Sequence, residues 1–314
     1  MDKMRTMDKE LYTQLRGTLV ILRKIAIDKW WWSNDLHLPE ILEKLEFDLL
    51  DFYDALEALG LSKKDKRRID KALIYFCRLH DGQMRKRGDK PYFTHILRVA
   101  SKVADILDKV QKNHEPELKN KAADIIISAL AHDSVEDHAA SIAGGSLIVK
   151  DVASERDKAL YVVENKFGES VRHWVSVLSK PNWEDPRNKK RDYSQWVQYI
   201  WQDGDWVSTI LKLSDILDNM EDTVSELETF EAQANSESKE ILKIMKKLIE
   251  KYGIILVDLS ENYDDYLANT ILLQKNVKEY IQKDINNILY RTKKLLGLNP
   301  SADHNELKAA LAKL

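Results

Sequence analysis

Apolar residues recur every three to four positions along most of the chain, which is the spacing of one face of an α-helix. No stretch shows the strict two-residue alternation of a half-buried strand. Only 10 glycines and 6 prolines interrupt the 314 residues, and Leu, Lys, Ile, Ala, Glu and Asp dominate. These residues favour long helices joined by short loops. The pattern therefore predicts an all-α fold.

The same pattern divides the chain into three segments. Residues 1–60 form an N-terminal helical extension of two amphipathic helices, with a break close to Trp30–Trp32. We expect these indole rings to cover a helix end; the alternative is an exposed contact for a partner or lipid. Residues 61–230 contain every candidate functional motif. Residues 231–314 form a C-terminal helical extension, whose apolar stripe predicts a helical hairpin or a dimer seam.

Two helices of the middle segment are apolar on nearly every face, as central buried helices are. They cover Ala122–Ala131 and Val207–Leu217, and Asp205 is the expected N-cap of the second. Asp133 follows the first helix and Asp215 lies inside the second. Both helices are therefore expected to carry a carboxylate into a core.

Composition and charge narrow the class of protein. The formal net charge of -3 provides no global field toward nucleic acid or a membrane, so neither partner is expected. The single cysteine, Cys77, excludes an internal disulfide framework and fits a reducing compartment. The N-terminus has the mixed charges that a signal peptide lacks, and Arg23 and Lys24 split the most apolar early run. We expect a cytoplasmic protein.

Four side chains from three separate segments have the chemistry of one metal site: His95, His132, Asp133 and Asp215. A buried carboxylate is costly without a cation or strong donors, and a shared divalent ion satisfies both aspartates. His132 and Asp133 are adjacent, so they converge on one ion only if the helix ends or bends there, which the Ser134-Val135 step allows. The mixed nitrogen and oxygen set suits Mn²⁺, Fe²⁺ or Zn²⁺ better than Ca²⁺.

Two further carboxylates follow this ligand pair at helical spacing. Glu136 lies four residues after His132, and Asp137 lies four residues after Asp133. A continuing helical turn places both on the face of the metal, where they can orient or deprotonate a water molecule. The alternative is an acidic helix end that faces solvent.

Polar groups for a phosphorylated ligand surround these motifs. The basic loop at 83–88 (QMRKRG) lies just before His95 and offers guanidinium and ammonium groups to phosphates, although a solvated charge run needs no function. Asn219 is one helical turn after Asp215 and can reach the same pocket. Lys212, one turn before Asp215, can pair with a carboxylate or make an ordinary structural hydrogen bond.

Together these motifs resemble the HD-type phosphohydrolases, and more narrowly the hydrolase domain of the RelA/SpoT alarmone enzymes and the small alarmone hydrolases. HDGQMRKRGDKPYFTH is similar to the family's H-x-G-Q-x-R-K-x-G-x-P-Y-x-x-H, and AHDSVED to its L-H-D-x-V-E-D. The FG of Phe167-Gly168 and KLSDILDN, similar to K-L-A-D-x-x-x-N, extend the match. The resemblance spans about Leu73 to Thr223 and implies an HD-domain helical bundle with additional helices at both ends.

The resemblance also implies a role for individual residues. Its metal ligands fall on His95, His132, Asp133 and Asp215. Its water-activating pair falls on Glu136 and Asp137, its phosphate-binding residues on Arg85 and Lys86, and its nucleotide contact on Asn219. The implied reaction is the Mn²⁺-dependent removal of the 3′-pyrophosphate from guanosine tetra- or pentaphosphate, which yields GDP or GTP and pyrophosphate. Fe²⁺ or Zn²⁺ is the alternative metal.

The chain departs from this family at several positions. Lys90 is an additional residue before Pro91, and Asp218 replaces a His of the long family members. Glu221-Asp222 adds negative charge near the expected pocket, and a longer connection that includes Ala143–Ser146 is either a lid or a surface loop. The tail shows only helical periodicity, so we expect hydrolysis without a synthetase domain.

Two other functions fit the same motifs. The first is an HD-type phosphatase or phosphodiesterase acting on another nucleotide, such as NADPH, a deoxynucleotide or a cyclic nucleotide. The second is a regulatory module that senses a nucleotide, with its flanking helices bound to a partner or to a second copy of the chain. A phosphorylated nucleotide is the expected ligand in each case.

Overall fold

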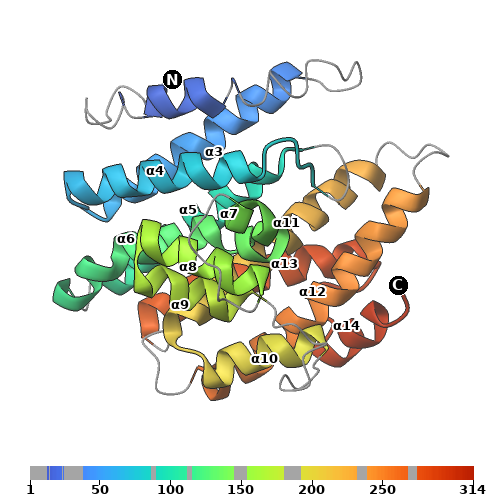
Figure 1. The fold of residues 1–314 in the computed structure, drawn as a ribbon. Helices are drawn as coiled ribbons and strands as arrows, with labels where there is room; N and C mark the ends of the chain where they lie inside the picture. The colour runs from blue at the N-terminus through green and yellow to red at the C-terminus, as the bar shows by residue number, and fades with distance from the viewer. Residues whose placement is uncertain are drawn as a thin grey trace. The chain divides into compact units, whose positions relative to one another are not determined.

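The computed structural model describes residues 13, 15–22, 24, 38–85, 90–111, 115–144, 154–179, 192–231, 239–267 and 274–314. Helices and short turns account for these ranges, and no strand occurs within them (Figure 1). Their only extended pairing is one isolated antiparallel bridge between Met84 and Pro91. The prediction of an all-α fold is therefore confirmed. Within the same ranges, every helix is too short or too polar to cross a bilayer.

The chain divides into two compact units, Met1–Lys190 and Arg191–Leu314. The first unit includes the helices α3 (Leu38–Ala58), α4 (Lys63–Leu79), α5 (Tyr92–Gln111), α6 (Glu115–Ala131), α7 (Ser134–Gly144), α8 (Glu155–Phe167) and α9 (Glu169–Leu178). Those of the second unit are α10 (Tyr193–Asp203), α11 (Trp206–Glu231), α12 (Lys239–Tyr266), α13 (Lys275–Leu295) and α14 (His304–Leu311). The three segments 1–60, 61–230 and 231–314 stay a prediction.

Helix α6 is central to the first unit. It packs against α4, α5 and α9, while α5 also packs against α3, and α7 packs against α8. The consecutive side chains of Ile125, Ile126 and Ile127 are all fully buried, as the sequence predicted for the Ala122–Ala131 part of this helix. A helix enclosed in this way holds the residues at its C-terminal end in fixed positions.

Helix α11 is central to the second unit, where it packs against α10, α12 and α13. Its start is set by Asp205, whose Oδ1 accepts a hydrogen bond of 2.7 Å from the backbone N–H of Ser208. This is the predicted N-cap. Leu211, Leu213 and Ile216 are fully buried, as the sequence predicted for this helix.

The C-terminal helices form the predicted hairpin. Helices α12 and α13 pack against each other, and Val277, Ile281 and Ile285 of the apolar stripe are buried. The alternative role of this stripe, as the contact surface between two copies of the chain, stays a prediction.

Three of the sequence predictions concern residues outside the described ranges. These are the role of Trp30–Trp32, the phosphate contact of Lys86, and a lid beyond Gly144 in the longer connection.

Candidate metal centre

His132 and Asp133 lie at a break between two helices. Helix α6 ends at Ala131, the two residues form a turn, and α7 begins at Ser134. The backbone N–H of Asp137 donates to the carbonyl of Asp133 over 2.9 Å, so the new helix starts directly from the turn. The predicted end of the helix is therefore present, and it allows adjacent side chains to point to one place.

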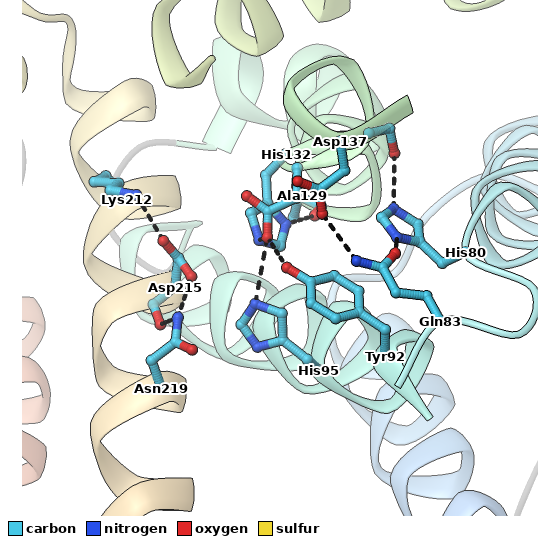
Figure 2. Close-up of polar contacts among 12 residues, drawn as sticks. His80, Gln83, Tyr92, His95, Ala129, His132, Asp137, Lys212, Asp215 and Asn219 are labelled. Atoms are coloured by element: carbon cyan, nitrogen blue, oxygen red, sulfur yellow. Dashed lines mark hydrogen bonds and ion pairs between the residues drawn. The ribbon is translucent and has the colours of Figure 1, made fainter. Parts of the chain in front are cut away.

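His95 reaches the same place from the first turn of α5. Tyr92 begins this helix and His95 follows three residues later on the same face, with ring centroids 5.5 Å apart. The Tyr92 hydroxyl donates to Oδ2 of Asp133, and Figure 2 shows Tyr92 and His95 side by side. Helix α5 and the turn after α6 thus contribute to one cluster, which we call the His95 cluster: His95, His132 and Asp133.

The spacing within the His95 cluster fits a metal ion. Oδ2 of Asp133 lies 2.9 Å from Nε2 of His132 and 3.7 Å from Nε2 of His95. Nitrogen and oxygen ligands that are about 2.1 Å from a metal are about 3 to 4 Å from one another. The three side chains can therefore hold a divalent ion with little movement.

The ring of His132 is oriented for this purpose. Its Nδ1 donates to the carbonyl of Ala129 over 2.8 Å (Figure 2). Because a carbonyl can only accept, the proton of the neutral ring is on Nδ1 and the lone pair is on Nε2, which faces Asp133. A fixed tautomer of this kind is typical of histidines that bind metals.

The charge of Asp133 fits the same interpretation. Burial raises the pKa of this carboxyl, but when the rings of His132 and His95 are protonated their charges and hydrogen bonds lower it more, to well below its ordinary range. Asp133 is consequently a carboxylate at neutral pH, the form that binds a cation.

Asp215 belongs to α11 of the second unit. Its Oδ2 accepts a hydrogen bond of 2.7 Å from Nζ of Lys212, and its Oδ1 accepts one of 2.5 Å from Nδ2 of Asn219 (Figure 2). Sequence spacing predicted both neighbours, and these strong donors satisfy the buried carboxylate. Lys212 also lies over the ring of Trp196, with Nζ 4.7 Å from its centroid.

Glu136 and Asp137 are exposed in the first turn of α7. Oδ2 of Asp137 accepts a hydrogen bond of 3.1 Å from Nε2 of Gln83. Although the residue is exposed, partial burial of its carboxyl raises the pKa of Asp137, as do the negative charges of Asp133 and Glu136. A raised pKa makes a carboxylate a better proton acceptor. The catalytic role of the pair stays a prediction.

Arg85 lies just before α5. Its backbone N–H donates to the carbonyl of Lys90 over 2.8 Å, next to the Met84–Pro91 bridge. The additional residue Lys90 therefore pairs with Arg85. The Arg85 guanidinium lies 5.5 Å from the centroid of the Tyr92 ring. Arg85 thus contacts the tyrosine that hydrogen-bonds to Asp133.

Sequence reasoning gave no role to three residues that surround the His95 cluster: Tyr92, His80 and His138. Tyr92 could have been found from its helical spacing to His95. The ring of His80 stacks on Tyr92, with centroids 4.9 Å apart and an angle of 16° between the planes. His138 approaches His80, with 3.1 Å between Nε2 of His138 and Nδ1 of His80. Nothing in the sequence pattern pairs these two histidines.

The metal-free protein should lose stability in mild acid through His80. Burial, together with the charge of His138, lowers the pKa of His80 from 6.5 to about 4, although its hydrogen bond to Gln83 opposes this. Between pH 6.5 and about pH 4 the His80 imidazole is protonated in the unfolded chain but neutral in the folded one. The free energy of unfolding is therefore highest above pH 6.5 and decreases as the pH falls through this range. The loss should reach at most about 3 kcal/mol. Urea unfolding across this pH range should show a steeper loss for the wild type than for His80→Gln; equal slopes would contradict the assignment.

No family model, curated protein or solved structure matches this chain.

Proposed function

We propose that the chain is a metal-dependent nucleotide phosphohydrolase. The observation that carries this proposal is the His95 cluster, in which an ionised carboxylate and an oriented imidazole lie at the spacing of metal ligands. Mn²⁺ is the first candidate for the ion, and Fe²⁺ and Zn²⁺ are the alternatives.

Hydrolysis needs an activated water and a group that accepts its proton. A bound divalent ion lowers the pKa of water from about 16 toward about 7. Glu136 and Asp137 begin the helix that follows the ligand pair, and Asp137 has the raised pKa that suits proton transfer. We assign the proton-accepting step to this pair.

Arg85 supports a phosphorylated substrate. Its guanidinium packs over the ring of Tyr92, and the hydroxyl of Tyr92 contacts Asp133. Only the Tyr92 side chain therefore separates this positive group from the His95 cluster. Guanidinium groups bind phosphate oxygens in pairs. We assign phosphate binding to Arg85, and to Lys86 by its position in the same basic loop.

Asp215 and Asn219 enter the proposal from the sequence motif KLSDILDN alone. Its similarity to the family motif makes Asp215 a fourth ligand of the metal and Asn219 a nucleotide contact. The hydrogen bond between their side chains shows that they share one helix face. In the protein with metal, Asp215 must share its carboxylate between the ion and these donors.

The resemblance to the alarmone hydrolases narrows the substrate. We propose removal of the 3′-pyrophosphate from guanosine tetra- or pentaphosphate, or from a closely related alarmone, as water is added. The products are GDP or GTP and pyrophosphate. The buried position of Cys77 as the only cysteine fits a reducing location, and we place the activity in the cytoplasm.

A nucleotide panel tests the substrate. The full chain would be incubated with Mn²⁺, Fe²⁺ or Zn²⁺ and with guanosine 3′-polyphosphates, NADPH, deoxynucleotides and cyclic nucleotides, and the released phosphate or pyrophosphate measured. We expect pyrophosphate from the guanosine 3′-polyphosphates. Turnover of another nucleotide alone would select the second hydrolase function, and tight binding without product under any metal would select the sensing module.

A further inference from the structure

A second group of metal-binding side chains lies beside the His95 cluster. It consists of His80, Asp137 and His138, each of which offers a ligand atom within 4.8 Å of the others. His80 is the C-cap residue of α4, and the other two lie in α7, which packs against α4. We propose that these three side chains bind a second divalent cation, with Oε1 of Gln83 as a further ligand. When this second ion is bound, Asp137 holds the ion and Glu136 keeps the proton-accepting role.

The ligand atoms are already gathered around Gln83. Its Oε1 lies 2.5 Å from Nδ1 of His80 and 3.0 Å from Nε2 of His138, while the two ring nitrogens are 3.1 Å apart. Its Nε2 donates to Oδ2 of Asp137 over 3.1 Å (Figure 2 labels His80, Gln83 and Asp137). Ligands of a first-row metal are about 3 to 4 Å apart, so small movements convert this group into a coordination shell.

Without a cation the contacts are poorly matched. If both imidazoles donate, Oε1 of Gln83 accepts two N–H groups at once. The two donor nitrogens, Nδ1 of His80 and Nε2 of His138, are then only 3.1 Å apart, so the two N–H groups crowd each other. If one imidazole instead accepts a hydrogen bond from the other, the lone pair of the accepting nitrogen faces the lone pair of Gln83 Oε1, and the two repel each other. Rotating the amide by half a turn brings that oxygen against the carboxylate of Asp137. A divalent ion removes the conflict, because it uses the lone pairs of both rings, the amide oxygen and the carboxylate together.

The rings are also held in place. His80 is fully buried and stacked on Tyr92, and its Nε2 lies 3.4 Å from Oγ of Ser134. A partner on the second ring nitrogen is a common feature of histidines that bind metals. His138 interrupts the helical geometry of α7, with φ -130° and ψ 24°. This change of direction accompanies the approach of its ring to His80, with centroids 4.4 Å apart.

The donor set indicates the class of cation. Two imidazole nitrogens, one carboxylate oxygen and one amide oxygen suit Zn²⁺, Mn²⁺ or Fe²⁺ rather than Ca²⁺ or Mg²⁺. Tyr92 connects this group with the His95 cluster, because its ring stacks on His80 and its hydroxyl contacts Asp133. A second ion beside the first is the arrangement that hydrolases use to hold both the attacking and the leaving oxygen of a phosphate.

Metal stoichiometry tests this site without any measurement of activity. The full chain would be stripped with a chelator, titrated with Mn²⁺ or Zn²⁺ by calorimetry, and its bound metal counted by mass spectrometry. We expect the wild type to bind an ion at each group. His138→Ala should lose one of them and keep the other, His95→Ala should show the opposite loss, and His173→Ala, at an exposed histidine of α9, should lose neither.

Two outcomes would overturn the second site. One is a wild type that binds a single ion, lost in His95→Ala and kept in His138→Ala, which would leave the His95 cluster intact as a site. The other is a His138→Ala protein with the wild-type stoichiometry. Circular dichroism would establish that each variant is folded, and Asp137→Asn would replace His138→Ala if that protein fails to fold.

Discussion

Replacing Asp133 with Asn should abolish metal binding at the His95 cluster and reduce nucleotide turnover on the order of 10³-fold, while the fold is retained. Oδ2 of Asp133 is the atom on which His132, His95 and the Tyr92 hydroxyl converge. The amide of Asn has almost the same shape but no negative charge. The substitution therefore removes the ionic ligand without opening a cavity in the core.

The measurement is the metal content of the purified chain, followed by its rate of pyrophosphate release. Glu169→Gln is the matched control, because it removes a negative charge from an exposed position in the first turn of α9. The control should keep both the metal and the wild-type rate. An Asp133→Asn protein that holds metal as the wild type does would show that Asp133 is not a ligand.

Replacing Tyr92 with Phe should lower the affinity for the metal by about 10- to 100-fold, because neighbours that orient a metal ligand typically contribute this much. The change deletes the hydroxyl that donates to Asp133 but keeps the ring that stacks on His80 and supports Arg85. Tyr92 is thus a positioning residue. At saturating metal most of the lost activity should return.

Metal titration of activity separates this effect from a general loss of structure. Tyr161→Phe, at an exposed tyrosine of α8, should titrate as the wild type does. An unchanged midpoint in Tyr92→Phe would contradict the positioning role. A rate that stays low at every metal concentration would instead place the hydroxyl in a later step of the reaction.

The parts of the fold that the sequence predicted correctly depend on local rules. The burial of the C-terminal half of α6 follows from its largely apolar sequence, and the start of α11 follows from the preference for Asp at an N-cap. The break after Ala131 followed from a chemical requirement, since adjacent residues cannot both reach one ion from a regular helix. Lys212 and Asn219 were found because one helical turn separates each from Asp215.

The contacts that the sequence did not predict depend on packing between distant segments. His80 and His138 are brought together by the packing of α4 against α7 and by the irregular backbone at His138, neither of which has a periodic signal. The position of Arg85 over Tyr92 depends on the Met84–Pro91 bridge, a pairing too short to leave an alternating pattern. Such contacts form only when distant segments pack together in the folded chain.

The most direct test of metal-dependent hydrolysis is pyrophosphate release from a guanosine 3′-polyphosphate by the wild-type chain, before chelation, after it, and after Mn²⁺ is returned. We expect turnover to disappear with the metal and to recover with Mn²⁺, because the His95 cluster supplies the ligands. Turnover that continues after complete removal of metal, or a metal-loaded chain that hydrolyses no phosphorylated nucleotide, would contradict the proposed function.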